Sequence, residues 1–181
     1  MTHLTLSLHV GDTGASALAA ALGRGALPRL ESLMLYNTTI GDAGLVALAP
    51  ALRRQPALET LSLMNNPLGD EGLAALVAPP PPAGALPPPN PYGVLTTLKK
   101  LYLMNTQSTD AGCAALAAAL DSGAMPALML VGLGGIPASA AATAAVHAAL
   151  DPALERNRPR APAVKVTARR TPQSRCTSYF V

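Results

Sequence analysis

The chain has 181 residues, half of them hydrophobic, and carries a formal net charge of +3. This length and apolar content suffice for one domain with a hydrophobic core, which excludes a wholly disordered protein. Trp is absent, Phe occurs once and Tyr four times, so Leu and Ala must form most of that core. Such a core suits thin layers that stack closely, as in a repeat array, better than one thick globular centre.

The sequence carries no signal for secretion or for membrane insertion. Its N-terminus runs into a strand pattern without a basic region, an apolar signal core or a cleavage site. No apolar stretch reaches the length of about 18 residues that a membrane span needs. Two cysteines, Cys113 and Cys176, are too few for a disulfide framework or a Cys-rich metal site. We therefore expect a cytoplasmic or nuclear protein that is not secreted.

The predicted elements form internal repeats. The first is a strand with alternating leucines over residues 4–8, followed by Gly11-Asp12. Residues 30–42, 58–70 and 98–106 match one another closely, while the copies at residues 4–8 and 128–133 are weaker. Each copy opens with a short strand, turns near Gly-Asp and continues as a helix rich in Ala and Leu. The sequence therefore predicts about five β-α units.

Helices are predicted over Asp42–Leu52, Asp70–Val77 and Asp110–Leu120, and a fifth after Ser139. The Asp that opens each of the first three stands where an N-cap is needed, and Ser139 is expected to cap the fifth. Pro50 is expected to interrupt the helix that contains it, because proline lacks a backbone donor.

One interval between repeats is longer than the others. Leu33 to Leu61 is 28 residues and Leu101 to Val131 is 30, whereas Leu61 to Leu101 is 40. The extra residues belong to a Pro-rich insertion at about 78–97, which is predicted to be an exposed polyproline-II loop. Residues 1–150 are therefore assigned to the repeat array. Residues 151–181, with 7 Lys/Arg against 2 Asp/Glu, are assigned to a basic tail that is predicted to be disordered.

The spacing Leu-x-x-Leu-x-Leu-x-x-(Asn/Thr)-x-(Ile/Leu)-Gly-Asp-x-Gly-x-x-Ala-Leu resembles ribonuclease-inhibitor-like leucine-rich repeats, which also occur in Ran GTPase-activating proteins and NOD-like receptors. The resemblance covers about residues 4–150. It implies an α/β fold, a right-handed horseshoe with a parallel sheet on the concave side and helices outside. The chain departs from the pattern at Thr38 and Thr106, which occupy the usual Asn position, and at Ser108, which replaces a buried Ile.

The candidate binding surface consists of residues that flank the strand leucines and so face the concave side. Met and Tyr offer adaptable or amphipathic area and Lys adds a donor, so this face suits a protein or a peptide. The alternative, ordinary strand-face residues with no partner, stays open. The predicted partner-binding residues are Ser32, Met34, Tyr36, Thr60, Ser62, Met64, Lys100, Tyr102 and Met104.

The remaining motifs favour structural roles. Asn37, Asn65 and Asn105 are predicted to hold turns, because Asn tolerates unusual backbone angles, rather than to form a binding row. Cys113 stands where the neighbouring repeats have Leu, so it is predicted to be a small core residue. No metal-ligand or phosphate-loop spacing occurs, and no nucleophile has a base placed for it. No catalytic residue, metal or cofactor is predicted.

The sequence thus predicts a protein-interaction module, not an enzyme, with an unidentified protein partner. The alternatives are a regulator of a small GTPase, implied only by the resemblance to Ran GTPase-activating proteins, and a fragment of a larger NOD-like receptor-type protein. Weaker alternatives are an SH3 ligand at Pro88 and Pro91, a PDZ ligand at residues 179–181 and nucleic-acid binding by the basic tail. The uncapped strand edge at Leu4 is expected to invite pairing with another chain.

Overall fold

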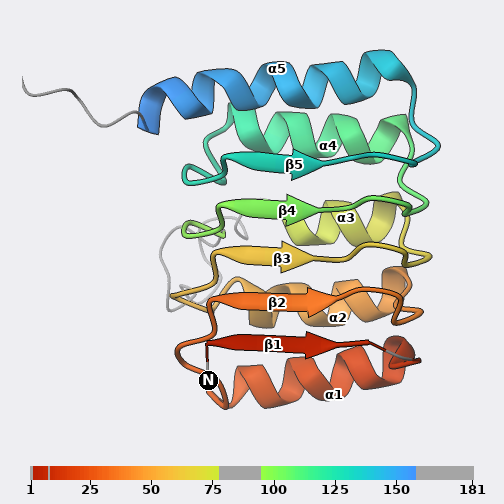
Figure 1. The fold of residues 1–181 in the computed structure, drawn as a ribbon, viewed down its shortest axis with the longest axis vertical. Coiled ribbons are helices and arrows are strands. Elements are labelled where there is room, and N and C mark those ends of the chain that lie inside the picture. Colours follow the sequence, from red (N-terminus) through yellow and green to blue (C-terminus); the bar gives the residue numbers. More distant parts are fainter. Residues whose placement is uncertain (1, 8, 78–94, 158–181) are drawn as a thin grey trace, which may run out of the picture.

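The computed structural model describes residues 2–7, 9–77 and 95–157, which form a β-α array (Figure 1). Its strands make one five-stranded parallel sheet in the order β1-β2-β3-β4-β5. This confirms the predicted α/β solenoid, in which each repeat contributes one strand and one helix. The elements are β1 (His3–Leu6), α1 (Gly11–Gly23), β2 (Ser32–Leu35), α2 (Asp42–Leu52), β3 (Thr60–Ser62), α3 (Asp70–Val77), β4 (Lys100–Tyr102), α4 (Asp110–Asp121), β5 (Leu130–Gly132) and α5 (Ala140–Asn157).

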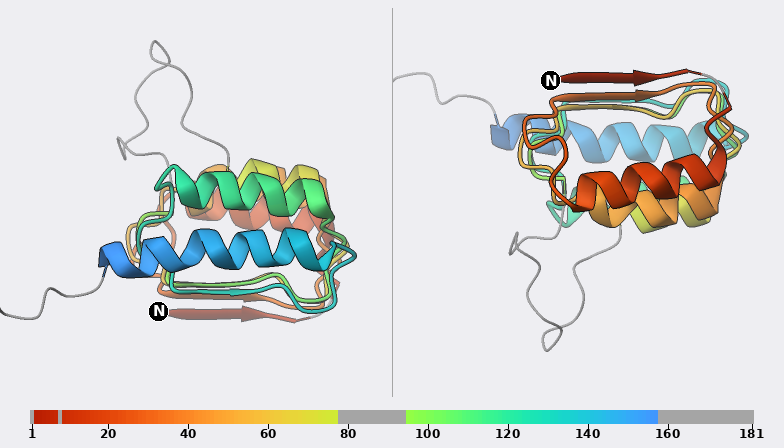
Figure 2. Two further views of the ribbon diagram at one scale, coloured as in Figure 1. Left: turned by 90° about the horizontal axis from the view of Figure 1, so that it is seen from above. Right: turned by 90° about the horizontal axis from the view of Figure 1, so that it is seen from below.

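The sheet register follows the leucine repeat. Leu4 pairs with Leu33, Leu33 with Leu61, Leu61 with Leu101, and Leu101 with Val131. All five helices lie on one side of the sheet and leave its other face open (Figure 2). The period of two along each strand therefore sends the leucines toward the helices and the intervening residues to the open face.

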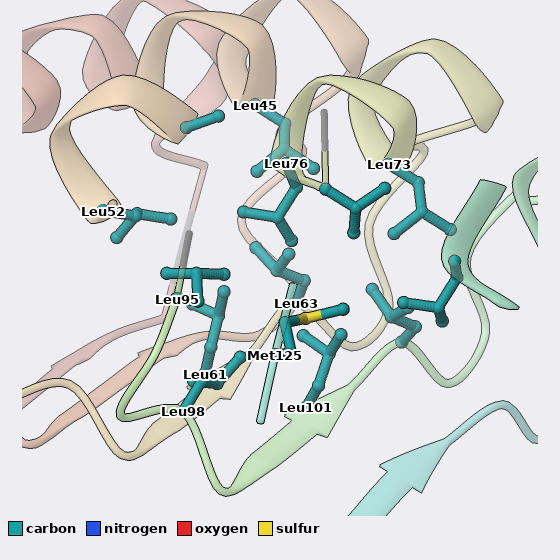
Figure 3. Close-up of a cluster of buried hydrophobic side chains, with 14 of the residues drawn as sticks. Leu45, Leu52, Leu61, Leu63, Leu73, Leu76, Leu95, Leu98, Leu101 and Met125 are labelled. Atoms are coloured by element: carbon teal, nitrogen blue, oxygen red, sulfur yellow. The ribbon is translucent and has the colours of Figure 1, made fainter. Parts of the chain in front are cut away.

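The core lies between the strands and the helices, where leucines from both layers meet (Figure 3). Leu61 and Leu63 of the third repeat face Leu73 and Leu76 of α3, and all four side chains have no exposed area. Full burial of a leucine contributes roughly 1.5–3 kcal/mol, so this continuous layer is the main source of stability. Cys113 is also fully buried, which confirms its predicted place in the core.

A ladder of aspartates links the helix starts of successive repeats. The Asp42 carboxylate accepts hydrogen bonds from the N–H groups of Gly69 and Gly72, at 2.7 and 2.9 Å. Asp12 bonds the start of α2 in the same way, and Asp70 the start of α4. Each aspartate thus caps the helix of the following repeat and not its own, which corrects the prediction from sequence.

The next step of the ladder differs. Asp110 accepts a hydrogen bond from the Ser139 N–H at 2.5 Å, while the Ser139 hydroxyl accepts one from the Ala142 N–H at 3.2 Å. Ser139 therefore caps α5 as predicted. Ala140 stands in α5 where the earlier helices have their Asp, so the described part of α5 offers no carboxylate at this position.

Hydrogen bonds hold the pKa of the Asp70 carboxyl below its ordinary value. Burial raises its pKa, but bonds from the Thr109 hydroxyl, the Thr109 N–H and the Gly112 N–H outweigh that effect, and the pKa lies below its ordinary value. A lowered pKa in the folded state contributes stability above the unfolded pKa, and this contribution is lost as the pH falls through the folded pKa.

The free energy of unfolding is therefore expected to fall as the pH drops below about 4, the ordinary range for Asp. Asp70→Asn should make this decline shallower in denaturant titrations between neutral and acidic pH. Glu71→Gln, which removes the adjacent exposed carboxylate, is the matched control and should change the slope less. Equal slopes for the two variants would contradict the role given to Asp70.

Where the strands end, Asn residues hold the turns. Asn37, Asn65 and Asn105 have φ of +56°, +56° and +54°, in the left-handed region that Asn tolerates better than most residues. This confirms the predicted turn role. Gly135, with φ of +74°, takes the same position in the fifth repeat.

Next to these turns lies a buried polar centre at Asn66. Its side-chain oxygen accepts hydrogen bonds from the N–H groups of Thr38 and Ile40, at 3.0 and 3.1 Å, and from the Thr38 hydroxyl at 3.0 Å. Its amide nitrogen donates to the carbonyls of Leu35, Leu63 and Met64. One side chain thus joins the turns of the second and third repeats.

The threonines at the usual Asn position make fewer bonds. In the fourth repeat the Thr106 hydroxyl donates to the Leu103 carbonyl at 2.8 Å and lies 3.4 Å from the Ser108 hydroxyl, and both side chains are buried. The replacement of the expected Ile by Ser108 is therefore matched by a hydroxyl neighbour, which satisfies a polar group that would otherwise be buried alone.

Two helices differ from their predicted course. Helix α2 continues through Pro50. Proline has no N–H, so the carbonyl of Val46, four residues earlier, loses its partner in the helix. Both residues are exposed, and water can therefore bond this carbonyl. Helix α5 passes the expected array boundary at residue 150 and ends at Asn157. The rest of the predicted tail and most of the Pro-rich insertion lie outside the described residues.

None of the described helices has the length and apolar character needed to cross a membrane.

Candidate functional site

The open face of the sheet brings the predicted binding residues together in rows that run across the strands. Parallel pairing places residues of equal position in each repeat side by side. The first row is His3, Ser32, Thr60, Lys100 and Leu130, and the second row is Thr5, Met34, Ser62, Tyr102 and Gly132. A third row, which we call the apolar row, follows the strand ends and consists of Tyr36, Met64 and Met104.

These residues differ in how much surface they offer. Met34 and Tyr36 are 37% and 40% exposed, whereas Ser32 and Ser62 are only 6% and 5% exposed. Ser62 lies between Met34 and Tyr102 in the second row, and these larger side chains leave little of it accessible. The two serines therefore serve as small spacers, although the sequence pattern predicts them as contact residues.

At the β4–β5 end, the absence of side chains at Gly132 and Gly134 leaves room for Tyr102 and Met104 to pack. A Cβ atom at Gly132 would lie 3.2 Å from Cδ1 of Tyr102 and 3.3 Å from Sδ of Met104. Tyr102 and Met104 thus pack onto the main chain of β5 and are half-buried. This packing restricts their motion, so less side-chain entropy remains to be lost when a partner binds.

The fifth repeat adds apolar residues that were not predicted from the sequence. Met129 and Leu130 are 58% and 42% exposed, and Leu130 stands next to Lys100 in the first row. The alignment of residues 128–131 with 98–101 already contained this information, since it places Met129 and Leu130 opposite Lys99 and Lys100. The open face therefore extends further along the array than predicted.

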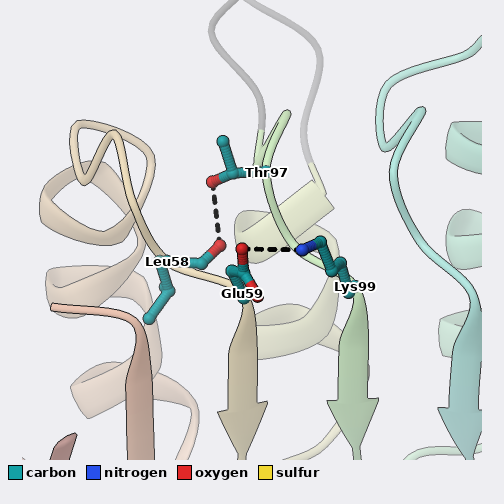
Figure 4. A network of polar contacts seen from close by, with 4 residues as sticks. All are labelled: Leu58, Glu59, Thr97 and Lys99. Atoms are coloured by element: carbon teal, nitrogen blue, oxygen red, sulfur yellow. Dashed lines mark hydrogen bonds and ion pairs between the residues drawn. The ribbon is translucent and has the colours of Figure 1, made fainter. Parts of the chain in front are cut away.

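An ion pair marks the edge of the open face where the strands begin (Figure 4). The Lys99 Nζ lies 2.7 Å from Oε1 of Glu59, and the Thr97 hydroxyl donates to the Leu58 carbonyl at 2.8 Å. Within the described residues this is the one ion pair, so Lys100, which is exposed, carries an unneutralised charge beside Leu130. The face thus combines an apolar row with a polar edge that holds a single unpaired lysine.

The described ranges hold neither a metal-ligand cluster nor an activated cysteine. They contain no group of three His, Cys, Asp or Glu residues that could hold a metal ion. Burial raises the pKa of the Cys113 thiol, and the charges of Asp110 and Asp70 raise it further, so this thiol is held in its unreactive protonated form.

Comparison with known proteins supports the class of fold. The family model described as a leucine-rich repeat matches residues 55–77. Actin-binding site 2 of leiomodin-1 has a similar structure, with a TM-score of 0.63, 17% sequence identity, and coverage of 87% of this chain and 83% of that chain. An internalin from Listeria monocytogenes aligns with a TM-score of 0.38 and 17% identity, over 69% of this chain and 35% of that chain. No curated protein sequence matches.

The chain therefore has the fold of a leucine-rich-repeat solenoid: parallel β-α units with helices on one side and an open sheet face on the other. These matches do not distinguish the ribonuclease-inhibitor-like subtype from other leucine-rich repeats, and that subtype stays a prediction from the sequence.

Proposed function

We propose that this chain is a protein-interaction module that binds a protein or peptide partner through the open face of its sheet. The observation that carries the proposal is the apolar area on this face, where Met34, Tyr36 and Leu130 are each more than a third exposed. Met adapts to partners of different shape, and Tyr offers both apolar area and a hydroxyl.

The arrangement of the face defines the chemistry of the partner. Apolar side chains of the partner would cover Tyr36, Met64 and Met104, and a carboxylate would pair with Lys100. Neighbouring strands lie about 4.8 Å apart, close to the 5.4 Å pitch of an α-helix. An amphipathic helix that crosses the strands would therefore place successive turns on successive repeats, with its apolar side on the apolar row.

The test is a capture experiment with a photo-crosslinking residue at position 36 and, as a control, at position 46. Val46 lies on α2 and is 40% exposed, as Tyr36 is, but it faces away from the sheet. Partners of the open face should crosslink at position 36 and not at position 46. Equal capture at both positions would overturn the proposal.

A quantitative test uses the triple variant Tyr36→Ala, Met64→Ala, Tyr102→Ala. Loss of three apolar contacts should weaken binding of a captured partner at least about tenfold by isothermal titration, because single interface anchors commonly contribute more than 1 kcal/mol. Val46→Ala should leave the affinity unchanged. Purified actin is one partner to include, because the leiomodin-1 segment of similar structure is an actin-binding site. Unchanged affinity of the triple variant for every captured partner would remove the open face from the interaction.

A further inference from the structure

The two ends of the array are closed differently. At the β5 end, α5 lies nearer the sheet than α4 does and covers the end of the core (Figure 2). Val131 and Leu133 of the last repeat are accordingly 5% and 7% exposed. At the β1 end, Leu4 and Leu6 are only partly buried, although their counterparts Leu33 and Leu35 have no exposed area. Apolar core surface therefore remains uncovered beside β1.

The main chain of β1 also has an open edge. The Ser32 N–H donates to the Thr2 carbonyl at 2.9 Å, and in the observed register β2 thus bonds the even-numbered residues of β1. Residues of a strand bond alternately to its two sides. The N–H and C=O groups of His3, Thr5 and Ser7 therefore point toward the open edge.

Nothing in the sequence of this edge prevents another strand from pairing with it. Natural edge strands are commonly protected by Lys, Pro, bulges or inward-pointing charges. Residues 2–7 read Thr-His-Leu-Thr-Leu-Ser and include no Pro and no Asp, Glu, Lys or Arg. Two copies of this strand placed edge to edge would therefore bring no Asp, Glu, Lys or Arg side chains of like charge together.

The start of α1 does not match the sites that receive an aspartate in the ladder. In α2 the N–H groups of Gly41 and Gly44 bond the Asp12 carboxylate of the preceding repeat. In α1 the equivalent N–H groups of Gly11 and Gly14 bond the carbonyls of Thr38 and Val10, at 2.8 and 3.1 Å. These donors of α1 are therefore satisfied without an aspartate from another repeat.

We propose that β1 pairs antiparallel with β1 of a second copy of this chain, on a two-fold axis that passes through the sheet at Thr5. Thr5 of the two copies would form a hydrogen-bonded pair, and His3 would pair with Ser7 of the other copy. Leu4 would then stand opposite Leu6 of the other copy. The leucines of both strands would point to the helix side of the joined sheet, so the two cores would meet. The two open faces would lie on the same side of one continuous sheet.

Sedimentation velocity of the full chain tests this proposal. The unmodified protein is expected to be a dimer at high micromolar concentration, and Thr5→Pro should weaken the dimer at least about tenfold, because each copy loses a donor of the central pair. The β1–β2 pairing does not use this N–H, so proline is tolerated there. Thr5→Val, which keeps the N–H, should remain dimeric, and far-UV circular dichroism should show both variants folded.

A proximity measurement gives a second, independent readout. In a Cys176→Ser background, Thr5→Cys should give a covalent dimer with a short bis-maleimide, while Cys113 is buried and does not compete. Thr13→Cys, on the exposed side of α1, is the control and should not crosslink. A monomer at all concentrations, a dimer that survives Thr5→Pro, or equal crosslinking at positions 5 and 13 would overturn the proposal. Both measurements use the protein without a partner, so their outcome is independent of the proposed binding function even though Thr5 belongs to the second row of the open face.

Discussion

Asn66→Ala is expected to lower the free energy of unfolding by about 3 kcal/mol, because it leaves several buried main-chain groups without a partner. Asn66 is 2% exposed, and its side chain bonds groups of both the second and the third repeat. In Asn66→Ala the Ile40 N–H and the Leu35 carbonyl lose their bonds to the Asn66 side chain. Both groups are buried, so water can replace these bonds only if the turns open. Urea titration followed by circular dichroism measures the change.

Two further variants separate the loss of these bonds from a general effect of substitution. Asn66→Thr should cost less than Asn66→Ala, because Thr38 and Thr106 occupy the same position in their own repeats and bond a local carbonyl. Gln107→Ala replaces an exposed amide in the following repeat and should change stability by less than about 0.5 kcal/mol. A loss of less than about 1 kcal/mol in Asn66→Ala would show that the network contributes little.

Gly72→Ala is expected to destabilise the protein by about 1–3 kcal/mol, the usual cost of overpacking, even though alanine is the better helix former. A Cβ atom at this position would lie 2.7 Å from Oδ1 and 3.2 Å from Cα of Asp42, and 3.3 Å from Cβ of Leu45. The carboxylate would have to withdraw from the N–H groups that it caps, and the backbone of α2 is too close to absorb the rest. Thermal and denaturant unfolding both measure the effect.

The matched control is Gly23→Ala, in α1, where a Cβ atom would meet nothing within 4 Å. It should be neutral or stabilising, as expected for Gly→Ala in an open helical position. The double variant Asp42→Ala, Gly72→Ala should lose less stability than the sum of the single variants, since removal of the carboxylate makes room for the methyl group. Strict additivity would mean that the contact with Asp42 is not the cause.

The ladder gives a physical reason for the Gly-Asp-x-Gly spacing, which the sequence alone suggested to serve turns and caps within each repeat. The second glycine is required because the carboxylate of the preceding repeat lies within 2.7 Å of where a side chain would begin at Gly72, and within 2.5 Å at Gly44 and Gly112. Sequence spacing alone does not reveal this, because Asp42 and Gly72 are 30 residues apart.

The same distinction applies to the candidate site. The nine residues predicted for it lie on one face of the sheet, as the period of two along each strand requires. Their accessibility was not predictable, since Ser62 is covered by neighbours from adjacent repeats and Tyr102 rests on Gly132 of the next strand. Met129 and Leu130 were missed because the fifth copy is one of the two weaker copies in sequence, although the structure forms both its strand and its helix.

By itself the sequence determined the repeating unit, the inward-facing leucines and the Asn turns, because each depends on residues a few positions apart and recurs along the array. Only the tertiary structure decided which helix each aspartate caps, which side chains of the open face remain accessible, and that β1 keeps an open edge while α5 covers the other end. These features depend on groups 27 to 42 residues apart in the chain, as the Asp42–Gly69 and Asp70–Gly112 bonds illustrate. Contacts at such separations arise only when the layers stack.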